Sequence, residues 1–307
     1  MSPARTVLMI RPVKFKLNQQ TIATNDFQKK SKLTDANVQT RALQEFQNLA
    51  KKLQKSGIEV IEIIDTKIPE KPDSIFPNNW FTTHKNGEVI LFPMLAENRR
   101  LERRLDIFET LSKNHNFQIT SITDLSFYEQ EYKFLEGTGS MVLDHKNKII
   151  YATLSPRTHL KPLQTFAKKI NHDYFIFETE YPTGKPVYHT NVVMATGQNS
   201  SIICLDLIKN NNQRQTIQKK LQSNHRKLIN ISIEQLGHFA GNMLQLQNKE
   251  GQLIWVMSQQ AYKALHPDQI AKLSADSQII YSDISTIENI GGGSARCMMA
   301  EIFLPKK

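Results

Sequence analysis

The segment HTNVVMATGQNSSIICLDL, residues 189–207, holds one copy of a pattern that recurs along this chain. It opens with polar residues, runs through apolar residues, turns at Gly and Asn, and returns as an apolar stretch, which predicts a β-hairpin. Segments of the same kind start near Asn79, at Glu136, at Gly241 and near Gly292, so successive copies lie 51 to 57 residues apart. A recurrence near 50 residues indicates a repeat architecture.

Segments with helical periodicity alternate with these hairpins. One helix is predicted to begin after Thr34 or Asp35 as its N-cap and to end at Gly57, with one apolar face made of Ala42, Phe46, Leu49 and Leu53. Others are predicted over LERRLDIFETLSKN, PLQTFAKKIN, RQTIQKKLQSN and SQQAYKALHPDQIAKLSA, and short strands such as IEVIEIID and KLINISI follow them. Five such units predict one α/β domain over residues 1–307, a five-bladed α/β propeller whose hairpin starts face a shared centre.

Composition narrows the class of protein. The 307 residues are 39% hydrophobic and 22% charged, as expected of an ordinary globular protein. No run of 18 apolar residues and no signal peptide are present, and two cysteines suit a reducing compartment, so we expect a cytoplasmic protein without a membrane partner. The net charge of +10 is spread along the chain without a nucleic-acid motif, which favours a solvated basic surface over nucleic-acid binding. The sequence leaves a homo-oligomer open.

The segment Gly291–Cys297, GGGSARC, lies between ISTI and MMAEIFL, which both resemble strands. Three glycines in succession indicate a sharp turn or a close approach of the backbone to another group. A thiol beside backbone N–H groups is the arrangement of a covalent catalyst, in which the amides receive the developing negative charge. A hairpin loop followed by a small buried cysteine explains this segment equally well.

The hairpin starts would bring Cys297, His189 and Glu136 together at the centre. These are the parts of a nucleophile, a general acid/base and a group that orients the histidine. Each residue alone has a structural explanation, but their equivalent positions in the repeat favour catalysis. A metal site would need the same three residues as ligands, and no spacing typical of metal ligands supports it, so we expect no metal and no cofactor. Cys204, within the apolar IICLDL, is predicted to lie in the core.

These segments resemble the guanidino-group modifying superfamily, which includes arginine deiminase, dimethylarginine dimethylaminohydrolase and the amidinotransferases, and whose fold is the five-bladed α/β propeller, or pentein. The resemblance covers nearly the whole chain, and the motifs occur in the family's order. They are PDSIFPNN at residues 72–79, FLEGTG at 134–139, YHTN at 188–191 and GGSARC at 292–297.

The resemblance implies a role for each residue at the centre. Cys297 would be the nucleophile, His189 the general acid/base and Glu136 its partner. Asp73 would hold the α-amino group of an amino-acid substrate, while Arg99 and Arg157 would clamp its α-carboxylate. Bidentate pairing of arginine with a carboxylate gives this last role physical support.

Three positions depart from the family's pattern, because Asn78, Asn79 and Asn191 stand where related enzymes hold the guanidinium with acidic residues. A buried guanidinium that faces amides would lose its charge partners, whereas an amide can both donate to and accept from a neutral ureido group. The pattern therefore resembles the branch that hydrolyses L-citrulline. A deiminase acting on arginine or dimethylarginine, and an amidinotransferase, remain alternatives if another carboxylate reaches the site. A non-catalytic pentein binding module is a more distant alternative, because that class lacks the Cys, His and Glu set.

The expected chemistry is attack by the Cys297 thiolate, favoured by a protonated His189, on the ureido carbon. The glycine loop, together with Asn79, would stabilise the oxyanion. Protonation of the δ-nitrogen by His189 would release ornithine and leave a carbamoyl thioester, which water cleaves to carbamate and then to ammonia and carbon dioxide. The polar segment from Gln19 to Ala36 is predicted to cover the site.

Overall fold

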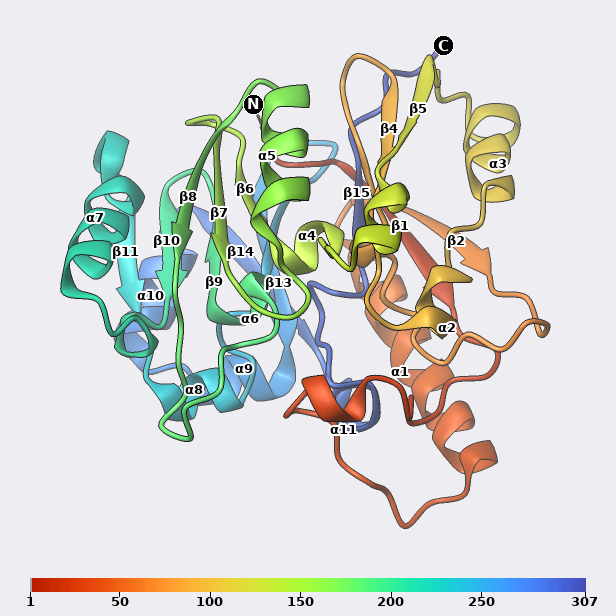
Figure 1. Cartoon of the computed structure of the whole chain (residues 1–307), viewed down its shortest axis with the longest axis horizontal. Helices are drawn as coiled ribbons and strands as arrows, with labels where there is room; N and C mark the ends of the chain where they lie inside the picture. Colours follow the sequence, from red (N-terminus) through yellow and green to blue (C-terminus); the bar gives the residue numbers. More distant parts are fainter. Residues whose placement is uncertain (1) are drawn as a thin grey trace.

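The computed structural model describes residues 2–307, which form five three-stranded sheets arranged around a centre (Figure 1). In each sheet the middle strand pairs antiparallel with an inner strand and parallel with an outer one. Four sheets follow the chain in order: β3 (Phe81–Thr83), β4 (Glu88–Leu91) and β5 (Ser121–Asp124); β6 (Val142–Asp144), β7 (Ile149–Thr153) and β8 (Asp173–Phe177); β9 (Met194–Thr196), β10 (Ser200–Ile203) and β11 (Lys227–Asn230); β12 (Leu244–Gln247), β13 (Leu253–Ser258) and β14 (Ser277–Ser282).

The two ends of the chain build the fifth sheet together. Strand β15 (Ala300–Ile302) pairs antiparallel with β1 (Thr6–Arg11), and β1 pairs parallel with β2 (Glu59–Ile64). The last hairpin of the sequence, which the C-terminus cuts short, is thus completed by N-terminal strands. The predicted five-bladed α/β propeller is confirmed.

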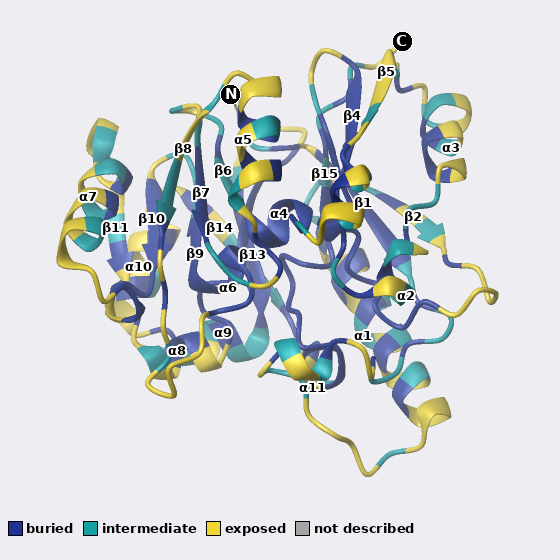
Figure 2. Cartoon of the chain, viewed as in Figure 1, coloured by how far each residue is buried: buried dark blue, intermediate teal, exposed yellow. Residues whose placement is uncertain are grey.

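The helices lie outside the sheets, and Figure 2 shows them buried on one face and exposed on the other. The principal ones are α1 (Asp35–Lys55), α3 (Asp106–Asn114), α5 (Leu160–Lys169), α7 (Asn211–Leu221), α9 (Gln259–Ala264) and α10 (Pro267–Ser274). The predicted N-cap is present in α1, where the Thr34 side chain accepts a hydrogen bond from the backbone of Asn37, and the predicted apolar face is buried. No helix among residues 2–307 is both long and apolar enough to cross a membrane.

Three predictions about single elements were wrong. SQQAYKALHPDQIAKLSA forms two helices because Pro267 excludes helical backbone at His266, which is extended with ψ 155°. LERRLDIFETLSKN does not form one helix either: the chain turns after α2 (Glu97–Arg100), and Arg104 donates to the Ile64 carbonyl at 2.9 Å before α3 begins.

The third error concerns ISTI, which begins a helix, α11 (Ser285–Gly291), instead of a strand. The Glu45 carboxylate, which belongs to α1, accepts hydrogen bonds from the backbone of Thr286 and Ile287 at 2.9 and 3.0 Å. It thereby satisfies N–H groups that the first turn of a helix leaves free, so a long-range contact overrides the β-branched composition.

Candidate active site

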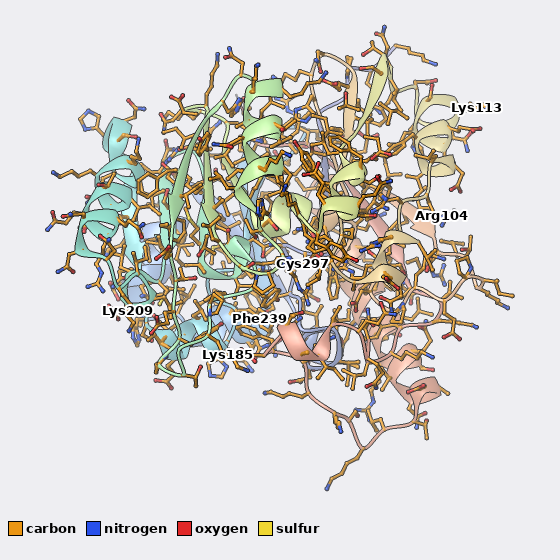
Figure 3. The ribbon with its side chains drawn as sticks, viewed as in Figure 1. Arg104, Lys113, Lys185, Lys209, Phe239 and Cys297 are labelled. Carbon is orange, nitrogen blue, oxygen red and sulfur yellow. The ribbon has the colours of Figure 1, made fainter. Side chains whose placement is uncertain are left out.

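Four short segments meet at the centre of the propeller, each at the start of an inner strand. They are η2 (Pro77–Asn79), α4 (Gly137–Ser140), α6 (Thr190–Val193) and the loop that follows α11. Figure 3 shows Cys297 near the middle of the molecule. Two of the segments approach so closely that a Cβ atom on Gly139 would collide with Asn79 and with the His189 ring. The predicted convergence of the hairpin starts is therefore present in the structure.

The glycine loop is shaped by close approach to an aromatic ring. A Cβ atom on Gly291 or Gly293 would lie 2.7 or 2.9 Å from the Phe76 ring, and Gly292 has a φ of +66°. Phe76 belongs to the PDSIFPNN motif, so the loop and that motif fix one another's positions. The glycines thus hold the cysteine against the centre, which favours the catalytic interpretation of the loop over that of a plain hairpin turn.

Glu136 and His189 form the hydrogen bond that the sequence predicted, with 2.8 Å between Glu136 Oε2 and His189 Nε2. Both side chains are buried, and Arg157 Nη1 lies 3.5 Å from the same carboxylate oxygen. Burial opposes ionisation of Glu136, but Arg157, His189 and Arg99 together outweigh it and hold the pKa of Glu136 well below its usual range. The carboxylate is therefore ionised at neutral pH.

Burial lowers the pKa of His189 to about 4, despite the opposing hydrogen bond to Glu136. Burial also raises the pKa of Cys297 above its ordinary value of 9.0. The resting pair at neutral pH is accordingly a thiol and a neutral imidazole. The expectation of a protonated His189 beside a thiolate does not describe this resting site, because desolvation penalises both charged forms.

Cys297 has amide neighbours, and one of them had no role in the sequence interpretation. Asn191 Nδ2 lies 3.6 Å and Asn242 Nδ2 3.4 Å from the Cys297 sulfur. Asn242 is itself held rigidly, because its Nδ2 also donates to the Asn191 carbonyl at 3.0 Å and its Oδ1 accepts from the Arg296 backbone at 3.1 Å. Its place at the start of the fourth hairpin was the available signal for a role at the site.

The backbone around the nucleophile offers fewer free donors than the sequence suggested. The N–H groups of Arg296, Cys297 and Met298 already have acceptors: Asn242 Oδ1, the Ser294 carbonyl and the Ala295 carbonyl, respectively. Asn79 is also engaged, since its Oδ1 accepts from Arg99 at 3.0 Å and its Nδ2 lies 3.5 Å from the Glu136 carbonyl. Side-chain amides are therefore the donors that contact the sulfur.

Arg99 is occupied by a partner that the sequence interpretation missed. Glu102 accepts two hydrogen bonds from it, from Nε and Nη2, both at 2.9 Å. The remaining Nη1 donates to Asn79, and Nε lies 3.7 Å from Asp73. With all three nitrogens engaged, Arg99 organises Asn79 and Asp73. The i to i+3 spacing of Arg99 and Glu102 within a helical turn was the signal for this pair.

Arg157 joins the centre to the segment predicted to cover it. Its Nε and Nη2 lie 3.2 and 2.7 Å from the Thr24 hydroxyl, and its guanidinium lies 5.1 Å from the centre of the Tyr188 ring. From the same covering segment, Asn25 donates to the Gly292 carbonyl at 3.2 Å. The segment therefore lies over both the arginine and the nucleophile loop.

Several buried polar atoms at the centre have no hydrogen-bond partner among residues 2–307. They are Asp73 Oδ1, Asn78 Nδ2, Asn78 Oδ1 and Asn191 Oδ1. Buried polar groups are normally paired, so a group of unpaired ones indicates a place for a ligand. Asn18 donates to the other Asp73 oxygen at 2.8 Å, which leaves Oδ1 as its open acceptor.

The described residues contain no group of three or more His, Cys, Asp or Glu side chains suited to hold a metal ion. Cys204, by contrast with Cys297, is packed in the largest apolar cluster, as predicted.

Solved structures with this fold are pentein enzymes. The chain matches the N-terminal domain of ArgZ, an arginine dihydrolase of cyanobacteria, with a TM-score of 0.73 and 17% identity over 98% of this chain and 99% of that one. It matches AgrE with a TM-score of 0.75 and 17% identity, and the dimethylargininase DDAH of Pseudomonas aeruginosa, solved with citrulline, with a TM-score of 0.67 and 16% identity. The coverage is 98% of this chain in both cases, against 40% of AgrE and 100% of the Pseudomonas enzyme.

Fold and site together define a member of the guanidino-group modifying superfamily. Residues 11–304 match the family described as N,N dimethylarginine dimethylhydrolase, eukaryotic, and the chain belongs to that family. No curated protein matches the chain. It spans 41% of the full length of ArgZ, of which it resembles the N-terminal domain.

Proposed function

We propose that this protein hydrolyses L-citrulline to ornithine, ammonia and carbon dioxide through a covalent thioester on Cys297. The observation that carries the proposal is the pair of amides on the nucleophile, with Asn191 and Asn242 at 3.6 and 3.4 Å from the sulfur. An amide can donate to the oxygen of a neutral ureido group and accept from its N–H groups. It supplies no charge to hold a guanidinium.

The carboxylates at the centre support the same substrate class, because each already has a cationic or polar partner. Glu136 is paired with His189 and Arg157, and Glu102 with Arg99. Asp73 has one open oxygen, which we assign to the α-ammonium group of the substrate. A buried guanidinium beside Cys297 would lack a free negative partner, at a cost of several kcal/mol.

The reaction begins with a proton transfer, since the resting thiol and imidazole are neutral. His189 accepts the Cys297 proton as the sulfur attacks the ureido carbon, and the ionised Glu136 stabilises the resulting imidazolium. Asn191 and Asn242 donate hydrogen bonds at the reacting centre. The imidazolium then protonates the δ-nitrogen, the C–N bond breaks, and ornithine departs from the carbamoyl thioester. Water cleaves the thioester to carbamate, which decays to ammonia and carbon dioxide.

Binding of the amino-acid end is assigned to residues around this centre. Arg157, with Nη1 directed to Glu136 and the other nitrogens to Thr24, is the arginine closest to the covering segment and is assigned to the α-carboxylate. Arg99 supports it by positioning Asp73 and Asn79. Asn78, whose amide atoms are both unpaired, is assigned to the ureido group. Strands β1 and β15 share a sheet, so we treat residues 1–307 as one catalytic domain.

The protein is further proposed to act in the cytoplasm, because its two cysteines are free thiols and suit a reducing compartment.

Hydrolysis of a guanidinium substrate is the second candidate. It is favoured by the family description, which names dimethylarginine, and by the likeness to ArgZ, described as an arginine dihydrolase. Asp73 Oδ1 would then be the carboxylate oxygen available to the guanidinium. Transfer of the bound group to an amine is a variant of the same chemistry, in which the acceptor replaces water.

The test is product analysis after the purified protein is incubated with L-citrulline, L-arginine or dimethylarginine. Ornithine and ammonia from citrulline, absent with Cys297→Ser, support the proposal. Citrulline formed from arginine or dimethylarginine, without ornithine from citrulline, overturns it in favour of the second candidate. A product that carries added glycine or ornithine would identify a transferase.

A further inference from the structure

A cavity of about 60 Å³ lies along the inner strands of the propeller. Its walls include Leu143 on β6, Thr196 on β9 and Leu244 on β12. One end reaches Asn191, at the start of the third hairpin, and the other reaches Gln198, at the turn of the same hairpin. The cavity therefore leads from the partly exposed hairpin turns toward the residues that surround the nucleophile.

Asn191 stands between this cavity and Cys297. Its Nδ2 lies 3.6 Å from the sulfur, whereas its Oδ1 is buried and has no partner among residues 2–307. The whole residue is only 2% exposed. A buried amide oxygen without a partner is an acceptor for a small donor such as water.

The covering segment closes a different approach to the site. Its Asn25 donates to the Gly292 carbonyl, and its Thr24 binds Arg157. Tyr188 also donates to the Gly292 carbonyl at 2.5 Å, which ties the nucleophile loop to the His189 segment. None of these three residues lines the axial cavity. The two approaches are thus separate.

We propose that the axial cavity is a water passage, and that Asn191 Oδ1 holds the water that hydrolyses the Cys297 thioester. The proposal rests on the proposed function, because it needs a carbamoyl thioester to form. The water oxygen attacks the thioester carbon and gives up a proton to His189, the C–S bond breaks, and the thiolate recovers that proton. The products are the Cys297 thiol and carbamic acid, which ionises to carbamate.

The size of the cavity limits what can pass. A water molecule occupies about 30 Å³ in the liquid, and a cavity of about 150 Å³ is known to hold benzene, so 60 Å³ has room for about two waters. Hydroxylamine is small enough to follow water, whereas ornithine is not. Hydroxylamine that reaches the carbamoyl thioester would release hydroxyurea and the free thiol.

The experiment narrows the passage and keeps the catalytic residues. Thr196→Phe places a ring in the cavity wall, and Leu143→Phe does the same from the facing strand β6. The matched control is Asn199→Phe, in the same hairpin turn as Thr196 but exposed and outside the cavity lining. Folding of each variant is checked by its thermal transition, so that one misfolded variant leaves the other for the test.

With citrulline as substrate, a narrowed passage slows only the step after ornithine release. We expect kcat to fall about tenfold in both cavity variants, with KM falling in parallel and kcat/KM unchanged. Their initial burst of ornithine should persist, carbamoylated enzyme should accumulate in intact-mass spectra, and less hydroxyurea should form with hydroxylamine. The Asn199→Phe control should behave as the parent protein.

Equal kcat in the folded cavity variants and the control would overturn the passage while leaving the citrulline reaction intact. Loss of kcat/KM with unchanged KM would also overturn it, because the acylation step would then be affected. If the parent protein gives no ornithine from citrulline, the proposed function itself fails. The burst in the parent thus separates the two kinds of failure.

Discussion

Glu136 and His189 are 53 residues apart in the chain, yet Glu136 Oε2 lies 2.8 Å from His189 Nε2 at the centre of the propeller. Each stands at the start of its own hairpin, so the repeat brings them together. The carboxylate is ionised and the imidazole is neutral at rest, which suits a histidine that accepts a proton and is then stabilised as a cation.

Replacing Glu136 with Gln should therefore reduce kcat by about 10²-fold or more, because the amide keeps the shape but cannot stabilise the imidazolium. Stopped-flow measurement of the ornithine burst should show a slower acylation step. Glu131→Gln, on an exposed pair with Lys161, is the matched control and should leave kcat unchanged. A kcat equal to that of the control would rule out this role for Glu136.

Asn242 is expected to matter about as much as a residue of an oxyanion hole. Its removal in Asn242→Ala should lower kcat about 10²-fold, because one of the two amide donors on the sulfur is lost. It should also raise the pKa of Cys297 further, since the amide favours the thiolate. Asn289→Ala, at an exposed position of α11, provides the control. Unaltered kcat and thiol titration in Asn242→Ala would exclude the assignment.

The resting thiol should be poorly reactive at neutral pH. Burial raises the pKa of Cys297 above 9.0, so the thiolate fraction, and with it the alkylation rate by iodoacetamide, should rise only at alkaline pH. The rate can be followed by intact mass over a pH series, with Cys297→Ser to subtract reaction at Cys204. A midpoint below pH 7 would show that the free enzyme already holds a thiolate and would contradict the proton transfer to His189.

Acid stability should depend on a histidine outside the site. Burial, together with the nearby His172 and His84, lowers the pKa of His145 to about 3 from 6.5. The unfolded chain then binds a proton more readily, so this contribution to stability is complete above pH 6.5 and is lost as the pH falls toward 3.

Unfolding by urea at pH 7 and pH 4.5 measures this effect. We expect the parent to lose about 1–3 kcal/mol more than His145→Asn between the two pH values. His115→Asn, at a histidine whose pKa is not lowered by burial in the same cluster, is a reference. Identical pH dependence of the parent and His145→Asn would refute the prediction.

Much of the fold could be predicted because the repeat is written in local patterns. Hairpin starts, turn residues and amphipathic helices recur every 51 to 57 residues, and the same recurrence placed Glu136, His189 and Cys297 at one centre. The pairing of β15 with β1 followed only from the three-dimensional closure of the ring.

What could not be predicted depends on contacts between distant segments. Helix α11 forms from a β-branched sequence because Glu45 binds its N-terminus. Arg99 was expected to face the substrate, but Glu102 engages it within the same turn. The neutral resting state of His189 follows from burial, which the sequence does not report.

The measurement that tests the central claim most directly is competition between L-citrulline and L-arginine at equal concentration in one reaction with the purified protein. Consumption of both is followed by mass spectrometry, and their ratio gives the ratio of kcat/KM values. We predict that citrulline is converted to ornithine about 10²-fold or more faster than arginine is consumed, because amides and not a free carboxylate face the reacting carbon. Consumption of arginine at an equal or greater rate would contradict the account.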